Sequence, residues 1–261
     1  MQEFDFVVVG SGSGLDVAST AVRQGLDVAV VEEGPLGGTC LNRGCIPSKM
    51  LIHRADLAEE IRGASAFGID ATIDGVDFAG MVEEVTDEVA EDAASIERGL
   101  RASDHHTLFH ERGRFVDDRT VEVGDERIRG ETVLVAAGTR PEIPDVDGID
   151  DVSYLTSKEA LELQERPDRL VVVGGGYIAA ELGHFFGAFG TDVTVVGRRD
   201  VLLPDEDPEI SETFTEVFGR KYDVHVGHEA TAVLDDGDEL TFRATGPDGD
   251  FDVTAAELLA A

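Results

Sequence analysis

Long apolar runs are the first thing this sequence lacks. No stretch approaches the run of about 20 apolar residues that a membrane-spanning helix needs. The chain opens MQEFDFVVVG, which reads directly as a strand and carries no secretory signal. These absences predict a soluble protein, and we expect it to be cytoplasmic.

Basic residues are also scarce. The chain has 21 Lys and Arg against 55 Asp and Glu, a net charge of −34, and its only lysines are Lys49, Lys158 and Lys221. Such a surface repels nucleic acid and anionic membranes, so neither is expected as a partner. The acids are spread along ordinary helix and strand patterns. This favours a halophilic protein, because at molar salt the Debye length is about 3 Å and self-repulsion is screened.

Cysteine is limited to Cys40 and Cys45, in GGTCLNRGCIPSK at residues 37–49. A zinc site needs about four ligands, and the sequence offers no second Cys pair or nearby His pair. A purely structural disulfide is disfavoured without a secretory signal, and so short a loop adds little stability. Two unrelated buried thiols are the third alternative. We favour a redox-active dithiol, because the Pro-Ser after Cys45 can open a helix whose dipole promotes the thiolate.

The sequence contains a diverged repeat. FDFVVVGSGSGLDVAST near the N-terminus and DRLVVVGGGYIAAELG in the second half each read as a strand, a Gly-rich turn and a helix. A second strand follows each at a similar distance, which is the dinucleotide-binding βαβ plan. Two structural turns are the alternative. We therefore predict an α/β protein with two Rossmann-like domains, residues 1–150 and 151–261, joined by a connection at 145–151.

The glycines of the two turns define two expected phosphate sites at helix N-termini. The first turn has Gly10, Gly12 and Gly14, but Leu15 stands where a third fingerprint glycine lets the helix pack closely on the strand. We expect Leu15 to push this helix outward slightly. The second turn consists of Gly174, Gly176 and Ala179, an accepted variant.

The ends of the two second strands differ. Glu32 ends the first, about 20 residues after its loop, where a carboxylate can accept from a ribose hydroxyl. Its counterpart is Gly197, followed by Arg198 and Arg199, a pattern that suits a 2′-phosphate. The second site is therefore predicted to prefer NADPH, with NADH less favoured. The alternative is that both arginines only pair with acids such as Asp205 and Glu206.

Apolar spacing predicts further elements. We expect helices at 48–63, 81–100 and 210–222. We expect strands at 119–123, 131–141, 224–226 and 239–244, and the second of these ends in a Gly-Thr turn that could return it to the first nucleotide site.

These motifs resemble the class I pyridine nucleotide–disulfide oxidoreductases, which include glutathione, mycothione and mercuric reductases and dihydrolipoamide dehydrogenase. The resemblance covers essentially the whole chain, and GSGSGLD is most similar to the turn of mycothione reductases. It implies FAD at the first turn and a nicotinamide nucleotide at the second. The residues it implies around FAD are Gly10, Gly12, Gly14, Glu32, Gly38, Thr39, Lys49, Phe115, Ala137 and Gly138.

The resemblance also assigns roles. Cys45 would lie nearest the flavin, and Cys40 would exchange with the substrate disulfide. Lys49 would form a buried pair with Glu181 near the flavin, a pair that is costly to break because one charge is then left alone. Tyr177 would cover the flavin until nicotinamide displaces it. Electrons would pass from NADPH through FAD and the Cys40–Cys45 disulfide to a small-molecule disulfide, a role in cell redox homeostasis.

Dihydrolipoyl dehydrogenase, in which electrons run the other way onto a lipoyl substrate, is the alternative activity. A metal-ion reductase is a lesser one. The chain ends where the family continues into a dimerisation domain that supplies a His-Glu pair across a homodimer. We therefore expect an N-terminal portion of such an enzyme, with weak turnover and no stable dimer, and a non-catalytic nucleotide-binding fragment is the remaining alternative.

Overall fold

The structure is a computed structural model, and it describes residues 1–237, 239–247 and 249–261. The described residues form two compact units with interleaved boundaries. The first comprises Met1–Pro47 and Thr86–Arg140, and the second comprises Ser48–Val85 and Pro141–Ala261. Both units are α/β, so the predicted fold class is confirmed.

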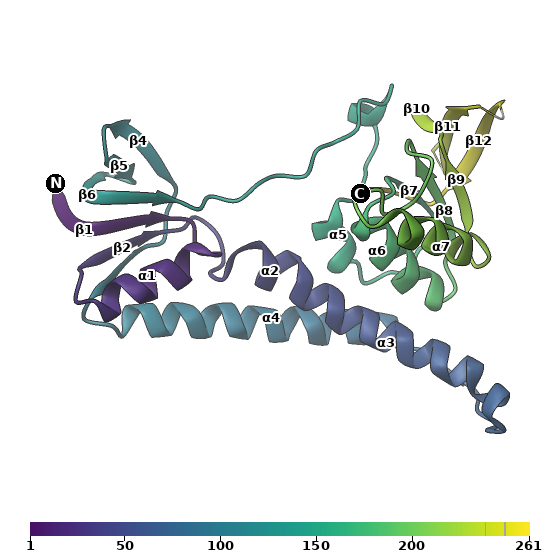
Figure 1. Ribbon diagram of the computed structural model, residues 1–261, viewed down its shortest axis with the longest axis horizontal. Coiled ribbons are helices and arrows are strands. Elements are labelled where there is room, and N and C mark those ends of the chain that lie inside the picture. Colours follow the sequence, from purple (N-terminus) through teal and green to yellow (C-terminus); the bar gives the residue numbers. More distant parts are fainter. Residues whose placement is uncertain (238, 248) are drawn as a thin grey trace. The chain divides into compact units, whose positions relative to one another are not determined.

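The first unit is built on a six-stranded sheet in the order β3-β2-β1-β6-β5-β4 (Figure 1). Its strands are β1 (Gln2–Val9), β2 (Val28–Val31), β3 (His106–Phe109), β4 (Gly113–Asp117), β5 (Thr120–Val123) and β6 (Glu126–Val135). Strands β3, β2, β1 and β6 are parallel, and β4 and β5 complete an antiparallel meander.

Both faces of this sheet are buried, which explains the continuous apolar runs in β1 and β2. Val8 and Val30 pack with residues of α1 (Gly14–Arg23) on one face. Val7 and Ala29 pack with Val121 of the meander on the other. Successive side chains of a strand alternate between faces, so a strand covered on both sides needs apolar residues at every position.

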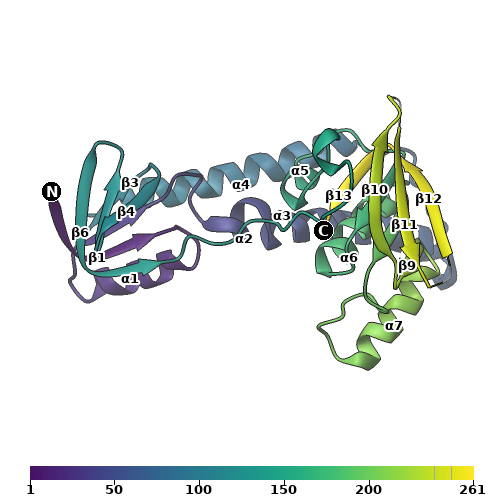
Figure 2. The same cartoon turned by 90° about the horizontal axis from the view of Figure 1, so that it is seen from above.

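The second unit has two sheets (Figure 2). A parallel sheet has the order β13-β7-β8-β9, formed by β7 (Arg169–Val173), β8 (Asp192–Gly197), β9 (Asp223–Val226) and β13 (Glu257–Ala260). An antiparallel sheet consists of β10 (Glu229–Asp235), β11 (Leu240–Gly246) and β12 (Gly249–Ala255). Helices α5 (Ser157–Leu161), α6 (Tyr177–Ala188) and α7 (Pro208–Gly219) complete the α/β core.

Two long helices, α3 (Cys45–Gly63) and α4 (Phe78–Arg101), confirm the predicted helices and extend beyond their predicted ends. Each contributes residues to both units. The apolar residues of α4 are divided between two cores, with Val82 and Val85 in one and Leu100 in the other. Leu51 and Ala55 of α3 are buried with Phe185 and Phe186 of α6 in the second unit. The short helix α2 (Gly38–Arg43) and the 3-10 helices η1 (Ala64–Phe67) and η2 (Ile149–Asp151) complete the described helices.

The predicted connection at 145–151 is not a free linker. The Asp147 amide donates to the Thr231 carbonyl at 3.0 Å, and Val146 and Ile149 are buried beside Val233. Burial of these two apolar side chains explains why the segment after Pro141 belongs to the second unit. Assignment of FAD to residues 1–150 and of the nicotinamide nucleotide to 151–261 remains a prediction.

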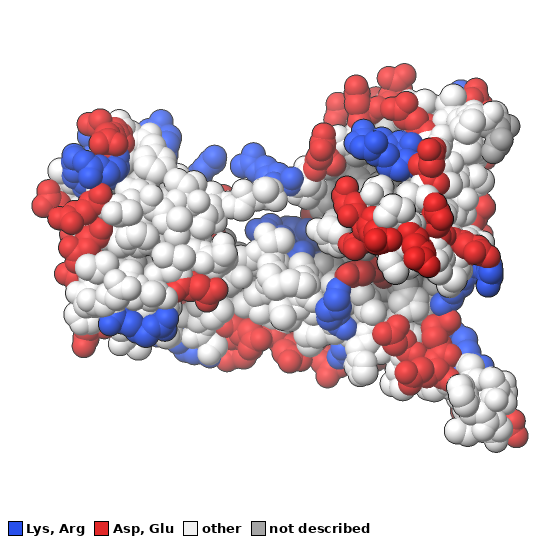
Figure 3. Space-filling model, in the orientation of Figure 1, with Lys and Arg blue, Asp and Glu red and all other residues white. Residues whose placement is uncertain are grey.

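Among the described residues, no helix combines the length and apolar character needed to cross a membrane. Acidic side chains are spread over the face shown in Figure 3 and are not confined to one segment.

Candidate functional site

The first Gly-rich turn lies between β1 and α1 and is shaped by close backbone contacts. Gly10 has φ +103°, and a Cβ there would lie 2.1 Å from the Ala136 carbonyl oxygen. A Cβ on Gly38 would lie 2.4 Å from the Gly12 Cα. A side chain at either position is therefore excluded, and the backbone is left open to approach by a phosphate.

Strand β6 starts and ends earlier than the predicted strand at 131–141, but it ends beside this turn, as the sequence predicted. Val135 pairs with Val9, and the Ala136 amide donates to the Val9 carbonyl at 2.7 Å. Ala137 follows directly, and Gly138 turns the chain away with φ +73°. The expectation that Leu15 pushes α1 outward is not supported at the start of the helix, because a Cβ on Gly14 would lie only 2.7 Å from Val8 Cγ1.

Glu32 follows β2 and is held beside the turn. Its Oε2 accepts from the Ser11 amide at 2.9 Å and from the Ser11 hydroxyl at 2.8 Å, and its Oε1 accepts from the Gly34 amide at 2.9 Å. Oε1 accepts only one hydrogen bond and so has a further lone pair, to which a ribose hydroxyl can still donate. The turn and Glu32 therefore fit a dinucleotide such as FAD, with the pyrophosphate at the start of α1.

Ser11 was missed by the sequence reasoning, although it is fully buried. Its hydroxyl also accepts from the Gly37 amide at 3.2 Å, so it joins the Gly-rich turn, Glu32 and the start of the cysteine segment. A small polar residue between two fingerprint glycines was the available signal.

Cys40 and Cys45 form a disulfide, with Cα atoms 5.0 Å apart. This confirms the Cys40–Cys45 disulfide that the family resemblance implied. Cys45 is the first residue of α3 and Cys40 lies in α2, and both residues are exposed. Gly44 allows the close turn between them, because a Cβ there would lie 3.1 Å from the Cys40 Cα.

Asn42 fixes the segment that carries Cys40. Its side-chain amide donates to the carbonyl oxygens of Leu36 and Gly38, each at 2.9 Å. Thr39 lies exposed on α2. Phe115 lies on β4 opposite Val121, with its ring about half exposed. The flavin contacts assigned to Thr39 and Phe115 remain predictions.

The second Gly-rich turn lies between β7 and α6. Gly174 has φ +138°, and a Cβ there would lie 1.8 Å from the Ala261 carbonyl oxygen. Space around Gly176 is open, since a Cβ would meet no described atom within 4 Å. Ala179 is 1% exposed, so this small residue lets α6 pack closely on the sheet. The turn fits a nicotinamide nucleotide at the N-terminus of α6.

Arg198 and Arg199 follow β8 and are exposed. Neither forms an ion pair within the part of the chain that the structure describes, so the alternative pairing with Asp205 or Glu206 is not observed there. The backbone of this segment is tied to the turn after β9, because the Gly227 amide donates to the Arg199 carbonyl at 2.7 Å. The backbone that carries both arginines is therefore fixed at the sheet end that carries the second turn.

Lys49 and Glu181 form the predicted ion pair, with the Lys49 Nζ 2.5 Å from Glu181 Oε1. The pair is not buried as expected, because the Lys49 side chain is 60% exposed. Ser48 adds a contact that the sequence reasoning missed, since its hydroxyl donates to Glu181 Oε2 at 2.8 Å. Tyr177, four residues before Glu181, is 68% exposed, and its role at the flavin remains a prediction.

Similarity to known proteins agrees with this geometry. Residues 4–259 match the family profile described as pyridine nucleotide-disulphide oxidoreductase. The mercuric reductase of Streptomyces lividans is 36% identical over 99% of this chain and 56% of its own length. The mycothione reductase of Mycobacterium tuberculosis is 36% identical over 98% of this chain and 60% of its own length.

A similar fold is found in the Cu(II) complex of RclA, an HOCl-induced flavoprotein disulfide reductase from Escherichia coli. It has a TM-score of 0.86 and 24% identity, and the alignment covers 100% of this chain and 56% of that one. The chain thus spans slightly more than half the length of these relatives. It belongs to the pyridine nucleotide-disulphide oxidoreductase family.

Proposed function

We propose that this protein is an FAD-dependent oxidoreductase that passes electrons from NADPH to a low-molecular-weight disulfide of the mycothione or glutathione kind. The observation that carries the proposal is the exposed Cys40–Cys45 disulfide at the start of α3. It lies in the same unit as a Gly-rich turn and a carboxylate that fit a dinucleotide. An exposed dithiol beside such a turn suits electron transfer.

When bound, FAD would supply a two-electron carrier between NADPH and the disulfide. The chain's own residues perform the exchange with substrate. In the reduced pair, the Cys40 thiolate attacks one sulfur of the substrate disulfide, and the first substrate sulfur leaves as a thiolate that takes a proton from solvent. The Cys45 thiolate then attacks the Cys40 sulfur in the mixed disulfide. The second substrate sulfur leaves as a thiolate and takes a second proton from solvent, and the Cys40–Cys45 disulfide forms again. The position of Cys45 at the N-terminus of α3 favours its thiolate.

Cofactor preference rests on Arg198 and Arg199. A guanidinium binds a phosphate by paired, charge-assisted hydrogen bonds, whereas a ribose hydroxyl is normally bound by a carboxylate. Gly197 supplies no carboxylate at that position. The arrangement favours NADPH and argues against dihydrolipoyl dehydrogenase, since NAD sites carry that carboxylate.

The first test is reduction of the bound flavin. We expect the purified chain to bind FAD and turn yellow, and its absorbance to bleach on anaerobic addition of NADPH. Oxidised mycothiol, oxidised glutathione, lipoamide and Hg(II) are then added separately. Return of the colour with a small-molecule disulfide supports the proposal. Selective return with lipoamide supports dihydrolipoyl dehydrogenase, and selective return with Hg(II) supports a metal-ion reductase. A chain that binds FAD but never bleaches contradicts an enzymatic role.

We further propose that the protein is halophilic, on the basis of its dispersed negative charge (Figure 3). The melting temperature is expected to rise steeply between about 0.1 M and molar KCl, because the Debye length falls from about 10 Å to about 3 Å and screens repulsion among the acids. Sucrose at equal osmolarity is the control, since it acts by exclusion from the surface without screening charge. A melting temperature that stays constant or falls with KCl contradicts the halophilic assignment.

A further inference from the structure

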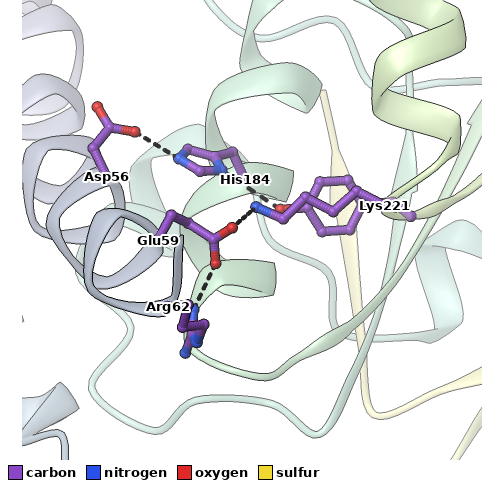
Figure 4. A network of polar contacts seen from close by, with 6 residues as sticks. Asp56, Glu59, Arg62, His184 and Lys221 are labelled. Carbon is purple, nitrogen blue, oxygen red and sulfur yellow. Dashed lines mark hydrogen bonds and ion pairs between the residues drawn. The ribbon is translucent and has the colours of Figure 1, made fainter. Parts of the chain in front are cut away.

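Three polar links join helix α3 to the segments around α6 and α7 within the second unit. Glu181 accepts from Ser48 and Lys49, as described above. Further along α3, Asp56 Oδ1 lies 2.8 Å from His184 Nε2, and Glu59 Oε2 lies 2.5 Å from Lys221 Nζ. Figure 4 shows the second and third links. We call these three links the α3 clamp.

The spacing along α3 places the clamp on one helix face. Lys49, Asp56 and Glu59 are separated by seven and three residues, which are two turns and about one turn of an α-helix. Glu181 and His184 are likewise three residues apart on α6. Two helices therefore present matching rows of charged and polar groups to each other.

Beneath the clamp the contact between α3 and α6 is apolar. Leu51 and Ala55 are fully buried, as are Phe185 and Phe186. Apolar packing is non-directional, so it holds the helices together but specifies their register weakly. Hydrogen-bonded ion pairs have fixed geometry, and they can specify which residues face each other.

His184 is held at both ring nitrogens. Its Nε2 lies against Asp56, and its Nδ1 is 3.5 Å from the Tyr222 hydroxyl. Burial raises the pKa of Tyr222, so this hydroxyl keeps its proton and can donate to Nδ1. With the Tyr222 hydroxyl donating to Nδ1, Nε2 is the ring nitrogen that donates to Asp56. The Tyr222 ring is seated on α6 at Gly187, where a Cβ would lie 2.2 Å from it.

The electrostatics of the Lys221–Glu59 link keep both of its groups ionised. Burial alone would raise the pKa of Glu59, but hydrogen bonds from Lys221 and Arg62 outweigh it and lower this pKa. Burial alone would lower the pKa of Lys221, but its contacts with Glu59 and Tyr222 raise it. Both groups are therefore charged at neutral pH.

The Lys49–Glu181 pair needs such support. Exposed ion pairs contribute little to stability, because solvent screens them and the side chains lose freedom. The Lys49 side chain is 60% exposed, so its own attraction to Glu181 does not hold it firmly. In the second link the side chains of His184 and Asp56 are 24% and 55% exposed, and in the third those of Lys221 and Glu59 are 38% and 32% exposed. Both links lie next to the aromatic core.

We propose that His184 and Lys221 are positioning residues that keep α3 in register with α6, so that Glu181 meets Lys49 and Ser48. The assignment of a redox role to Lys49 rests on the proposed function, but the register itself does not. Lys49 lies four residues after Cys45, and Glu181 lies four residues after Tyr177 at the start of α6. The clamp thus positions the Lys49–Glu181 pair. Lys49 lies about one helical turn after Cys45 of the dithiol on α3, and Glu181 lies about one helical turn after the start of α6, which follows the second Gly-rich loop.

The small number of lysines makes a direct test practical. Selective labelling of lysine side chains gives three signals in an NMR spectrum of the whole chain, one each for Lys49, Lys158 and Lys221. Lys158 is exposed and, within the described residues, its amine forms no ion pair, so its signal serves as an internal reference. The Lys49 signal should differ from that of Lys158 and move toward it in Glu181→Gln.

The decisive variants lie away from Lys49. In His184→Ala and in Lys221→Met, the Lys49 signal is expected to move most of the way toward the Lys158 signal. His184→Gln should keep the Lys49 signal, because the glutamine amide can still donate to Asp56. Arg220→Met is the matched control, since it removes an ion pair within the α7 region, to Glu216, that does not involve α3. That variant should leave Lys49 unchanged.

A Lys49 signal that stays in place in both His184→Ala and Lys221→Met overturns the proposal. If His184→Ala fails to fold, Asp56→Ala replaces the exposed partner of the same link and carries the same expectation. The measurement uses neither nucleotide nor disulfide substrate. Failure of the register proposal is therefore distinguishable from failure of the reductase proposal, which the flavin-bleaching experiment tests.

Discussion

Cys45→Ser is expected to abolish turnover of a disulfide substrate in the FAD-loaded chain while leaving NADPH able to bleach the flavin. Serine cannot form or re-form the disulfide with Cys40, so a mixed disulfide with substrate cannot be resolved inside the chain. The loss should exceed the roughly 10²–10⁴-fold effect typical of removing a general acid or base, because a reacting sulfur is removed.

An anaerobic reductive titration measures this effect directly. A chain with the intact pair should take up one two-electron equivalent more than Cys45→Ser, since a disulfide accepts one electron pair. Cys40→Ser is the matched variant and should show the same deficit. Melting temperatures of the oxidised proteins control for a structural effect, which should be small because the two cysteines are only five residues apart. Wild-type turnover in either variant would show that the dithiol is not the redox centre.

Replacing Arg198 and Arg199 together by alanine is expected to weaken NADPH binding by one to a few kcal/mol, or about fivefold to a few hundredfold. Both guanidinium groups are exposed and have no ion-pair partner among the described residues, so a 2′-phosphate competes with no protein carboxylate for them. NADH lacks that phosphate, and its affinity should change little.

Titration of both nucleotides by flavin absorbance or calorimetry compares their dissociation constants. Arg220→Ala is the control, because it removes an exposed arginine of the same unit that pairs with Glu216. The salt concentration must be held constant between titrations, since phosphate contacts are screened. Equal affinity of the unmodified protein for NADPH and NADH would contradict the assigned preference.

Local sequence was sufficient for much of the fold. Apolar runs followed by glycines predicted β1 with α1 and β7 with α6, because a buried parallel strand and a phosphate-binding turn each require particular residue types. The helical spacing after Ser48 and Met81 predicted α3 and α4. The spacing of Cys40 and Cys45 at a helix start correctly predicted a disulfide.

Other features were outside the reach of local patterns. The interleaved units follow from the packing of Leu51 and Ala55 on Phe185 and Phe186, which are more than 100 residues away in sequence. The segment at 145–151 read as a polar connection, yet Val146 and Ile149 are buried against β10. The acidic residues of this segment make it resemble a polar connection. Strand β10, which covers its two apolar residues, is distant in sequence, so the local pattern does not predict their burial.

The sequence by itself determined the dithiol, the two Gly-rich turns, the Glu32 and Arg198–Arg199 contrast and the acidic surface, because each depends on residue type and short spacing. Only the tertiary structure decided the partners of Ser11, Ser48 and His184, and the exposure of Lys49. Those properties depend on which side chains from distant segments meet at a helix face or strand end. Such meetings are set by the burial of apolar surface over the whole unit, which no single motif encodes.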